Sequence, residues 1–135
     1  MAALRGFEKA VEVGGRRHVV KVVDGGAGLQ KGRGGGVLLK IKIAAEVDGV
    51  RGEYSITFRR RGRAVVGYAY AKAGAPGGRE ADAERLAAVV KALTDEEPKV
   101  YRLRDGRIMI ACNSLRGFAR YRELAKYVVA WVAVA

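Results

Sequence analysis

Basic side chains alternate with apolar ones along two adjacent segments of this chain, and the basic positions could neutralise phosphate groups. In residues 37–47 (VLLKIKIAAEV) the polar positions include Lys40 and Lys42, and in residues 50–60 (VRGEYSITFRR) they include Arg51 and Arg59. Alternation with a period of two is typical of a half-buried β-strand. The pattern therefore predicts a sheet with one apolar face and one basic face, a geometry suited to a polyanion.

The turn between these two segments predicts their pairing. Asp48-Gly49 is a two-residue hairpin signal, and it places apolar residues opposite one another, as with Ile43 and Tyr54. A slip of one residue would exchange the two faces. We therefore expect Lys40 and Lys42 to point outward.

A third strand is expected over residues 64–72 (AVVGYAYAK), and its orientation has two solutions. A two-residue turn at Arg61-Gly62 places Tyr68 and Tyr70 on the outer face, where they could stack on bases. A bulge at Gly62 would instead bury both tyrosines in the core. The pattern leaves the two alternatives open.

Two helices and a second hairpin are expected further along the chain. Residues 79–94 carry an apolar stripe at helical spacing, and a final helix begins at Asn113 or Ser114 and continues to about Val132. Between them, residues 99–104 and 107–111 form a hairpin about Asp105-Gly106, with Tyr101 and Leu103 on the inner face. The outer positions of this hairpin are Arg102, Arg104 and Arg107.

The pattern as a whole predicts an α+β fold with element order β-β-β-α-β-β-α. We expect a curved antiparallel sheet with the helices on one face. Residues 1–35 are interpreted as a short β-rich lead followed by a glycine-rich connector or hinge over residues 24–36, and residues 36–135 as the α+β domain.

Net charge favours an anionic partner. The chain of 135 residues carries a formal charge of +12 and has a pI of about 10.3, as is common in proteins that bind nucleic acid. The basic residues concentrate on the strands, whereas residues 79–97 are acidic; the alternative is that lysine and arginine simply solvate an exposed sheet. The candidate nucleic-acid contacts are Lys40, Lys42, Arg51, Arg59, Arg60, Arg61, Arg63, Tyr68, Tyr70, Arg102, Arg104 and Arg107, with residues 60–63 expected to clamp a phosphate.

Catalytic and metal-ligating patterns are missing from the sequence. His18 and Cys112 are the only residues of their types, so we interpret His18 as a strand residue and Cys112 as a small buried one. The glycine-rich segment has no GK[ST] and leads into a strand, unlike a phosphate-binding loop. No catalytic residue, metal or cofactor is expected.

The C-terminal run YVVAWVAVA is apolar but is only nine residues long, against the roughly 20 that cross a membrane. We expect it to dock on the core or on a partner, and homodimerisation through this helix is an alternative function. A single cysteine and the lack of a secretory segment favour the cytoplasm. Scarce Asn and Gln are typical of thermophiles, although a GC-rich genome gives the same bias.

Three segments, AEVDGVRGEYSITF, APGGREADAERLAAVVKAL and RDGRIMI, resemble the paREP group, which are repeated paralogous proteins of hyperthermophilic archaea. The resemblance covers roughly residues 36–132. That group has no assigned activity, so the resemblance implies kinship and no chemistry.

The element order is also similar to one repeat of the LAGLIDADG homing endonucleases. In that family a curved sheet cradles DNA, which implies DNA rather than RNA as the partner. Its nuclease activity depends on a helix that ends in a metal-binding acid just before the first long strand. Here KGRGGG occupies that place and Asp24 is the nearest preceding acid. The sequence therefore favours a non-catalytic nucleic-acid-binding module, with a degenerate homing endonuclease as a further alternative.

Overall fold

The computed structural model describes residues 1–135 as one curved antiparallel sheet of seven strands packed with three helices. The elements are, in chain order, β1 (Glu8–Val13), β2 (Arg16–Lys31), the 3₁₀ turn η1 (Arg33–Gly35), β3 (Val37–Val47), β4 (Val50–Arg61), β5 (Ala64–Tyr70), α1 (Gly78–Thr94), β6 (Lys99–Arg102), β7 (Ile108–Cys112), α2 (Leu115–Ala119) and α3 (Arg122–Val134). The predicted α+β class is confirmed.

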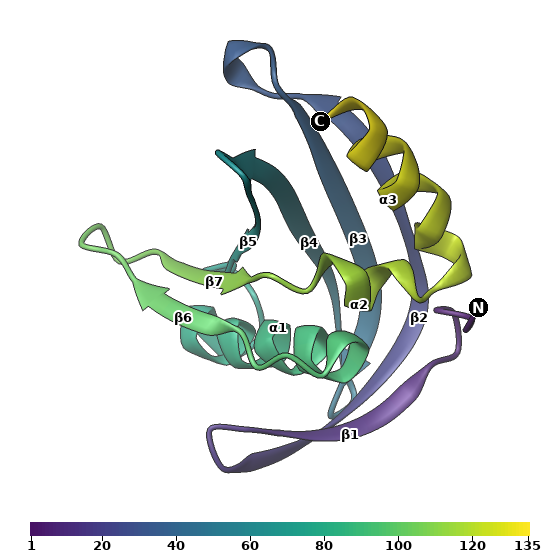
Figure 1. Cartoon of the computed structure of the whole chain (residues 1–135). Helices are drawn as coiled ribbons and strands as arrows, with labels where there is room; N and C mark the ends of the chain where they lie inside the picture. The colour runs from purple at the N-terminus through teal and green to yellow at the C-terminus, as the bar shows by residue number, and fades with distance from the viewer.

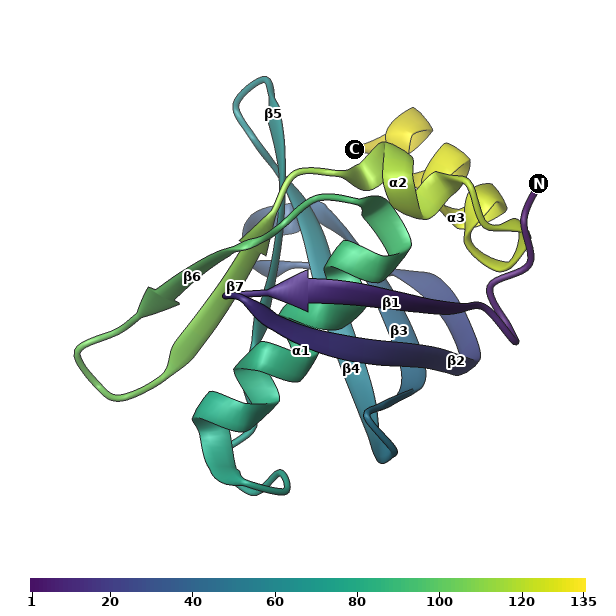
Figure 2. The same ribbon diagram turned by 90° about the horizontal axis from the view of Figure 1, so that it is seen from below.

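The strands lie in the order β1-β2-β3-β4-β5-β7-β6. Helix α1 packs against β1, β2 and β3 and also against β7, while α3 packs against β2 and β3 (Figure 1). A single helix can contact both β1 and β7 only if the sheet curves around it, and the view from below shows β1 and β2 passing across α1 (Figure 2).

The predicted register of the β3–β4 hairpin is confirmed. Ile43 lies opposite Tyr54 and Lys42 opposite Ser55. Asp48 and Gly49 have φ values of 52° and 81°, as a type I′ turn requires. Alternate residues of β3 are buried, so Lys40 and Lys42 point to the opposite face, as expected.

The prediction of a glycine-rich connector over residues 24–36 is wrong for most of that segment. Strand β2 continues to Lys31 and pairs with β3 along its whole second half, from Asp24 opposite Ala44 to Lys31 opposite Val37. Glycine has a low intrinsic preference for strands, but here the backbone hydrogen bonds to β3 hold the glycine-rich segment in an extended conformation. Only residues 32–36 remain as a connection, and Val20 and Val22 of the lead share the hydrophobic core of the later strands.

Helix α1 occupies the predicted segment, whereas the predicted final helix is divided in two. Tyr121 is extended (φ −98°, ψ 133°) and separates α2 from α3. The N-terminal residues cause the interruption: the Ala2 N–H donates to the Arg120 carbonyl, the Arg122 N–H donates to the Ala2 carbonyl, and the Glu123 carboxylate accepts from two further backbone N–H groups. No helix of the fold combines the length and the apolar character needed to cross a membrane.

Candidate nucleic-acid interface

The face of the sheet opposite the buried side chains, here called the outer face, carries most of the predicted contacts. Lys40 and Lys42 of β3 lie there beside Thr57 and Ser55 of β4. Of the predicted residues, those on this face are Lys40, Lys42, Arg51, Arg59, Tyr68, Tyr70 and Arg107.

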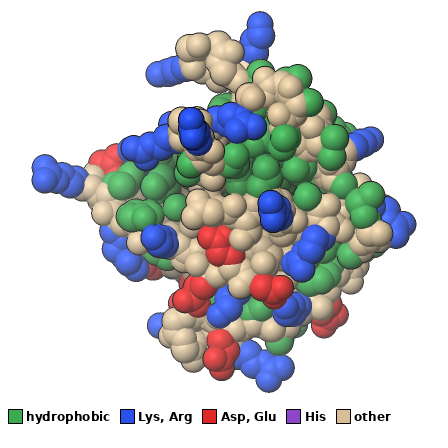
Figure 3. All heavy atoms as spheres, viewed as in Figure 1, with side chains coloured by type: hydrophobic (Ala, Val, Ile, Leu, Met, Phe, Trp, Pro, Cys, Tyr) green, Lys and Arg blue, Asp and Glu red, His purple; other side chains and the backbone are tan.

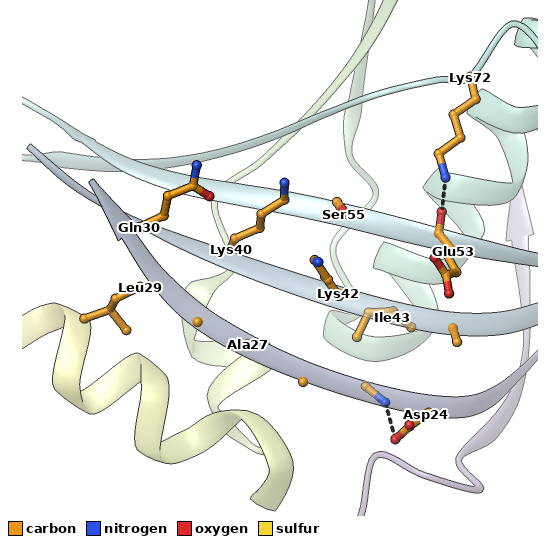
Figure 4. A pocket seen from close by; sticks show the side chains of 14 residues that line it. Asp24, Ala27, Leu29, Gln30, Lys40, Lys42, Ile43, Glu53, Ser55 and Lys72 are labelled. Atoms are coloured by element: carbon orange, nitrogen blue, oxygen red, sulfur yellow. Dashed lines mark hydrogen bonds between the residues drawn. The ribbon is translucent and has the colours of Figure 1, made fainter. Parts of the chain in front are cut away.

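A groove of about 700 Å³ runs along this face over β2, β3 and β4. The β2 side has no side chain directly opposite the two lysines, because Gly26 and Gly28 are the strand partners of Lys42 and Lys40, with Asp24 and Gln30 further along the strand in either direction. A Cβ atom added at either glycine would meet nothing within 4 Å. The glycine-rich stretch therefore makes room beside two lysines rather than acting as a hinge (Figure 4).

Three lysines (Lys40, Lys42 and Lys72) and two acids (Asp24 and Glu53) line the groove. Neither Lys40 nor Lys42 forms an ion pair. Asp24, at one end of the groove, is paired with Arg5 at 3.0 Å. The hydrogen bond from Arg5, followed by that from the Gly25 N–H, lowers the pKa of Asp24. The unpaired lysines are thus available to an external anion.

Tyrosines adjoin the groove on β5. The exposed alternative is the one the structure adopts: Tyr70 is 42% exposed and Tyr68 is half-buried, with their rings 6.1 Å apart in an edge-to-face arrangement. The turn lies one residue later than expected, with Arg61 opposite Ala64, but this shift keeps the same residues on the outer face.

Two arginines stand over these rings. The Arg59 guanidinium lies 5.7 Å from the centre of the Tyr68 ring, and that of Arg107 lies 5.1 Å from the centre of the Tyr70 ring. Such cation–π contacts hold a positive charge beside an aromatic surface. Base stacking and phosphate contact thereby become possible at adjacent points.

The predicted orientation of β6 is wrong, so Arg102 does not lie on the outer face as predicted. Tyr101 lies opposite Met109 and Arg102 opposite Ile108, one residue away from the expected register. The cause is the connection, in which Leu103 and Arg107 are joined by a hydrogen bond of 2.9 Å around three residues, with Gly106 at φ 90°. A three-residue loop of this kind exchanges the faces that a two-residue turn would give.

Arg102 therefore lies on the helix side, where its guanidinium donates two hydrogen bonds of 3.0 and 2.8 Å to Glu80 of α1. Tyr101, expected to be buried, is 44% exposed on the outer face. It lies across β7 from Tyr70, since both have Met109 as their strand partner. A three-residue loop between β6 and β7, had it been assumed, would have predicted the exposed position of Tyr101 and the helix-side position of Arg102.

The remaining predicted contacts lie at the ends of hairpins. Arg60 projects to the helix side, 5.9 Å from the centre of the Trp131 ring, and so does not join the expected clamp. Arg61, Arg63 and Arg104 are exposed in or beside turns. The structure does not bring these three into the groove.

His18 and Cys112 lie away from the outer face. His18 is a buried strand residue between two carboxylates, with Nδ1 2.6 Å from Asp48 and Nε2 2.7 Å from Glu84. Burial raises the pKa of Cys112 to about 12, which disfavours a thiolate. No three His, Cys, Asp or Glu side chains lie close enough together to hold a metal ion.

Comparisons of this chain with family models, with curated proteins and with solved structures each give no match.

Proposed function

We propose that this protein is a non-catalytic nucleic-acid-binding module that uses the outer face of its sheet. The observation that carries the proposal is the groove beside β2, where Lys40 and Lys42 have no acidic partner and Tyr68 and Tyr70 adjoin them. The proposal agrees with the similarity in element order to a LAGLIDADG repeat, whose curved sheet holds DNA. It needs no catalytic acid.

Phosphate binding of this kind has a measurable signature. Each phosphate neutralised by a lysine or arginine releases counterions, so the affinity falls linearly with salt on a logarithmic scale, by about 0.9 in slope for each contact on duplex DNA. The double variant Lys40→Gln/Lys42→Gln should therefore bind more weakly and with a shallower salt slope. Fluorescence anisotropy with a labelled oligonucleotide over a salt series measures both quantities.

A matched control removes the same amount of charge elsewhere. Arg116 and Arg122 are exposed, lie on α2 and α3, and form no ion pair. The variant Arg116→Gln/Arg122→Gln should retain the wild-type salt slope. Equal losses in the two double variants would show that net charge alone, and not the outer face, determines the binding.

A second candidate function is self-association through α3. Leu124, Val128 and Trp131 of this helix are buried, and the Trp131 indole donates to the Val37 carbonyl at 2.7 Å. On its other side, Val129 is 71% exposed and Val132 is also exposed. Figure 3 shows further hydrophobic side chains at the surface over the upper parts of β3, β4 and β5.

Light scattering tests this second function. If α3 forms a homodimer, the variant Val129→Lys/Val132→Lys should halve the measured mass without unfolding the protein. A monomeric wild type would exclude it and leave the nucleic-acid proposal unaffected.

A further inference from the structure

Strands β4 and β5 separate part of the way along the sheet. Their ladder extends only from Arg61–Ala64 to Thr57–Tyr68. Beyond that point β5 pairs with β7, while β4 continues to pair with β3. Across the resulting gap, Lys72 Nζ donates a hydrogen bond of 2.9 Å to the Glu53 carbonyl.

A cavity of about 230 Å³ occupies this gap and passes from the outer face to the helix layer. Thr57, Tyr68 and Tyr70 line it from the sheet, whereas Asp82 and Leu86 line it from α1. It shares four lining residues with the groove and so adjoins it, namely Lys40, Glu53, Ser55 and Lys72.

Two polar side chains that line this cavity have unused hydrogen-bonding capacity. Asp82 is only 5% exposed; its Oδ2 accepts from the Lys72 N–H at 2.7 Å, but its Oδ1 lies 3.8 Å from Arg85, which is too far for a hydrogen bond. The Tyr54 hydroxyl is buried and has no partner. Buried polar groups are almost always hydrogen-bonded, so the Tyr54 hydroxyl indicates a ligand with polar edges. Asp82 Oδ1, which is ion-paired with Arg85 but accepts no hydrogen bond, offers a charged acceptor in the same cavity.

We propose that the gap binds one unpaired nucleobase of a single-stranded nucleic acid. The cavity is smaller than the roughly 300 Å³ typical of drug-sized ligand sites, so it suits a single ring system rather than a whole nucleotide. Tyr68 and Tyr70 at its mouth offer surfaces on which neighbouring bases stack. A paired base would first have to leave its stack, and single strands are therefore preferred over duplex.

The chemistry of Asp82 selects among bases. An ionised carboxylate accepts hydrogen bonds and donates none, so it favours a base with an exocyclic amino group. Among pyrimidines this is cytosine, whose N4 amino group pairs with carboxylates, whereas the corresponding O4 of thymine is an acceptor. This inference depends on the proposed function, because the strand must first bind the outer face.

The test compares labelled oligo(dC), oligo(dT) and a mixed-sequence duplex, all of the same length, by anisotropy at one salt concentration. The wild type should bind oligo(dC) about tenfold more tightly than oligo(dT), which is within the range of one good hydrogen-bonded pair. It should bind the duplex most weakly. Asp82→Asn keeps an acceptor for the Lys72 N–H and presents an amide donor to the ligand, so it should reverse the preference in favour of oligo(dT).

A second variant blocks the cavity without touching its charges. Thr57 lines the cavity but not the groove, so Thr57→Phe places a ring at the mouth and should reduce oligo(dC) binding to the level of oligo(dT). Val66→Phe is the control, because Val66 lies opposite Arg59 on the same face but lines neither the cavity nor the groove. Melting curves of both variants verify the fold.

The outcomes separate the two proposals. Salt-dependent binding with equal affinity for oligo(dC) and oligo(dT), or tighter binding of the duplex, would overturn the base site and leave the proposed function standing. Failure of all three probes to bind would overturn the proposed function as well.

Discussion

His18 Nδ1 on β2 lies 2.6 Å from Asp48 Oδ2, so a buried strand residue is tied to the turn of the next hairpin. The same carboxylate accepts from the Val19 N–H at 2.8 Å. The Val19 hydrogen bond in first place, and the His18 contact after it, lower the pKa of Asp48. The turn between β3 and β4 is thereby anchored to β2.

This anchor makes stability depend on pH. Because the pKa of Asp48 is lower in the folded state than its unfolded value of about 3.9, its stabilising effect is present above that value and is lost as the pH falls through the folded pKa. Asp48→Asn, which suits the positive φ of this position, should lower the free energy of unfolding near neutral pH. We expect a loss below about 1 kcal/mol, since the half-exposed side chain is screened by solvent.

Urea unfolding at a series of pH values measures this difference. The gap between the wild type and Asp48→Asn should close as the pH falls below about 4, whereas the exposed Glu8→Gln should follow the wild type throughout. A gap that persists in acid would mean that the carboxylate charge has no part in the anchor.

Gly26 and Gly67 both lie within strands, but their replacement by alanine should have different effects on stability. An added Cβ at Gly26 meets open space, whereas at Gly67 it would lie 2.6 Å from the buried Phe58 ring and 2.9 Å from Cys112 Sγ. Gly26→Ala should leave stability unchanged or raise it by about 0.5–1 kcal/mol, and Gly67→Ala should cost about 1–3 kcal/mol through overpacking. Thermal melts distinguish them, and equal effects would contradict the packing described for β5.

Tyr101 and Arg102 should exchange the roles that strand alternation alone predicts for them. Tyr101→Ala removes an aromatic surface from the outer face and should weaken oligonucleotide binding several-fold, given that stacking contributes about 1–3 kcal/mol per base. Arg102→Ala should leave the affinity and its salt slope nearly unchanged, since its guanidinium is already paired with Glu80. Anisotropy titrations decide the matter, and a larger effect from Arg102 would reverse the assignment of faces.

Glu96, which follows α1 in the chain, anchors the start of α2 by hydrogen bonds. Its carboxylate accepts hydrogen bonds from the Asn113 N–H at 3.0 Å and the Ser114 N–H at 2.8 Å. Glu96→Ala should cost about 1–2 kcal/mol, because both donors lose a charged partner. Glu97→Ala, which loses only an exposed pair with Lys91, should cost less than about 1 kcal/mol. Chemical denaturation compares the two variants, and similar losses would argue against the anchoring role.

The parts of the fold that could be predicted are those where two local signals agree. The Asp48-Gly49 turn and the alternation around it both indicate one register, and that register is the observed one. In the β6 segment, Val100, Tyr101 and Leu103 do not alternate clearly with polar residues, so the loop length alone decides the register. The predicted register of β6 was wrong, and the faces predicted for Arg102 and Tyr101 were therefore wrong as well.

Other features depend on residues that are distant in the chain. The strand over residues 24–31 exists because β3 pairs with it, and its glycines carry no pattern of their own. The carboxylates beside His18 come from positions 48 and 84. The cavity lies where the pairing of β5 with β4 ends at Tyr68, while Ala69 and Tyr70 remain paired with β7 on the other edge of β5. Local sequence does not encode any of these relationships directly.

The three-residue connection between Leu103 and Arg107 also has an evolutionary consequence. Removal of the Leu103 codon would keep a three-residue loop but pair Arg102 with Arg107, which would move every residue of the edge strand β6 to the opposite face of the sheet. Arg102 would then replace Tyr101 on the outer face. An aromatic edge and a cationic edge are thus separated by a single deletion, so a lineage could change from stacking on bases to holding phosphates without any substitution.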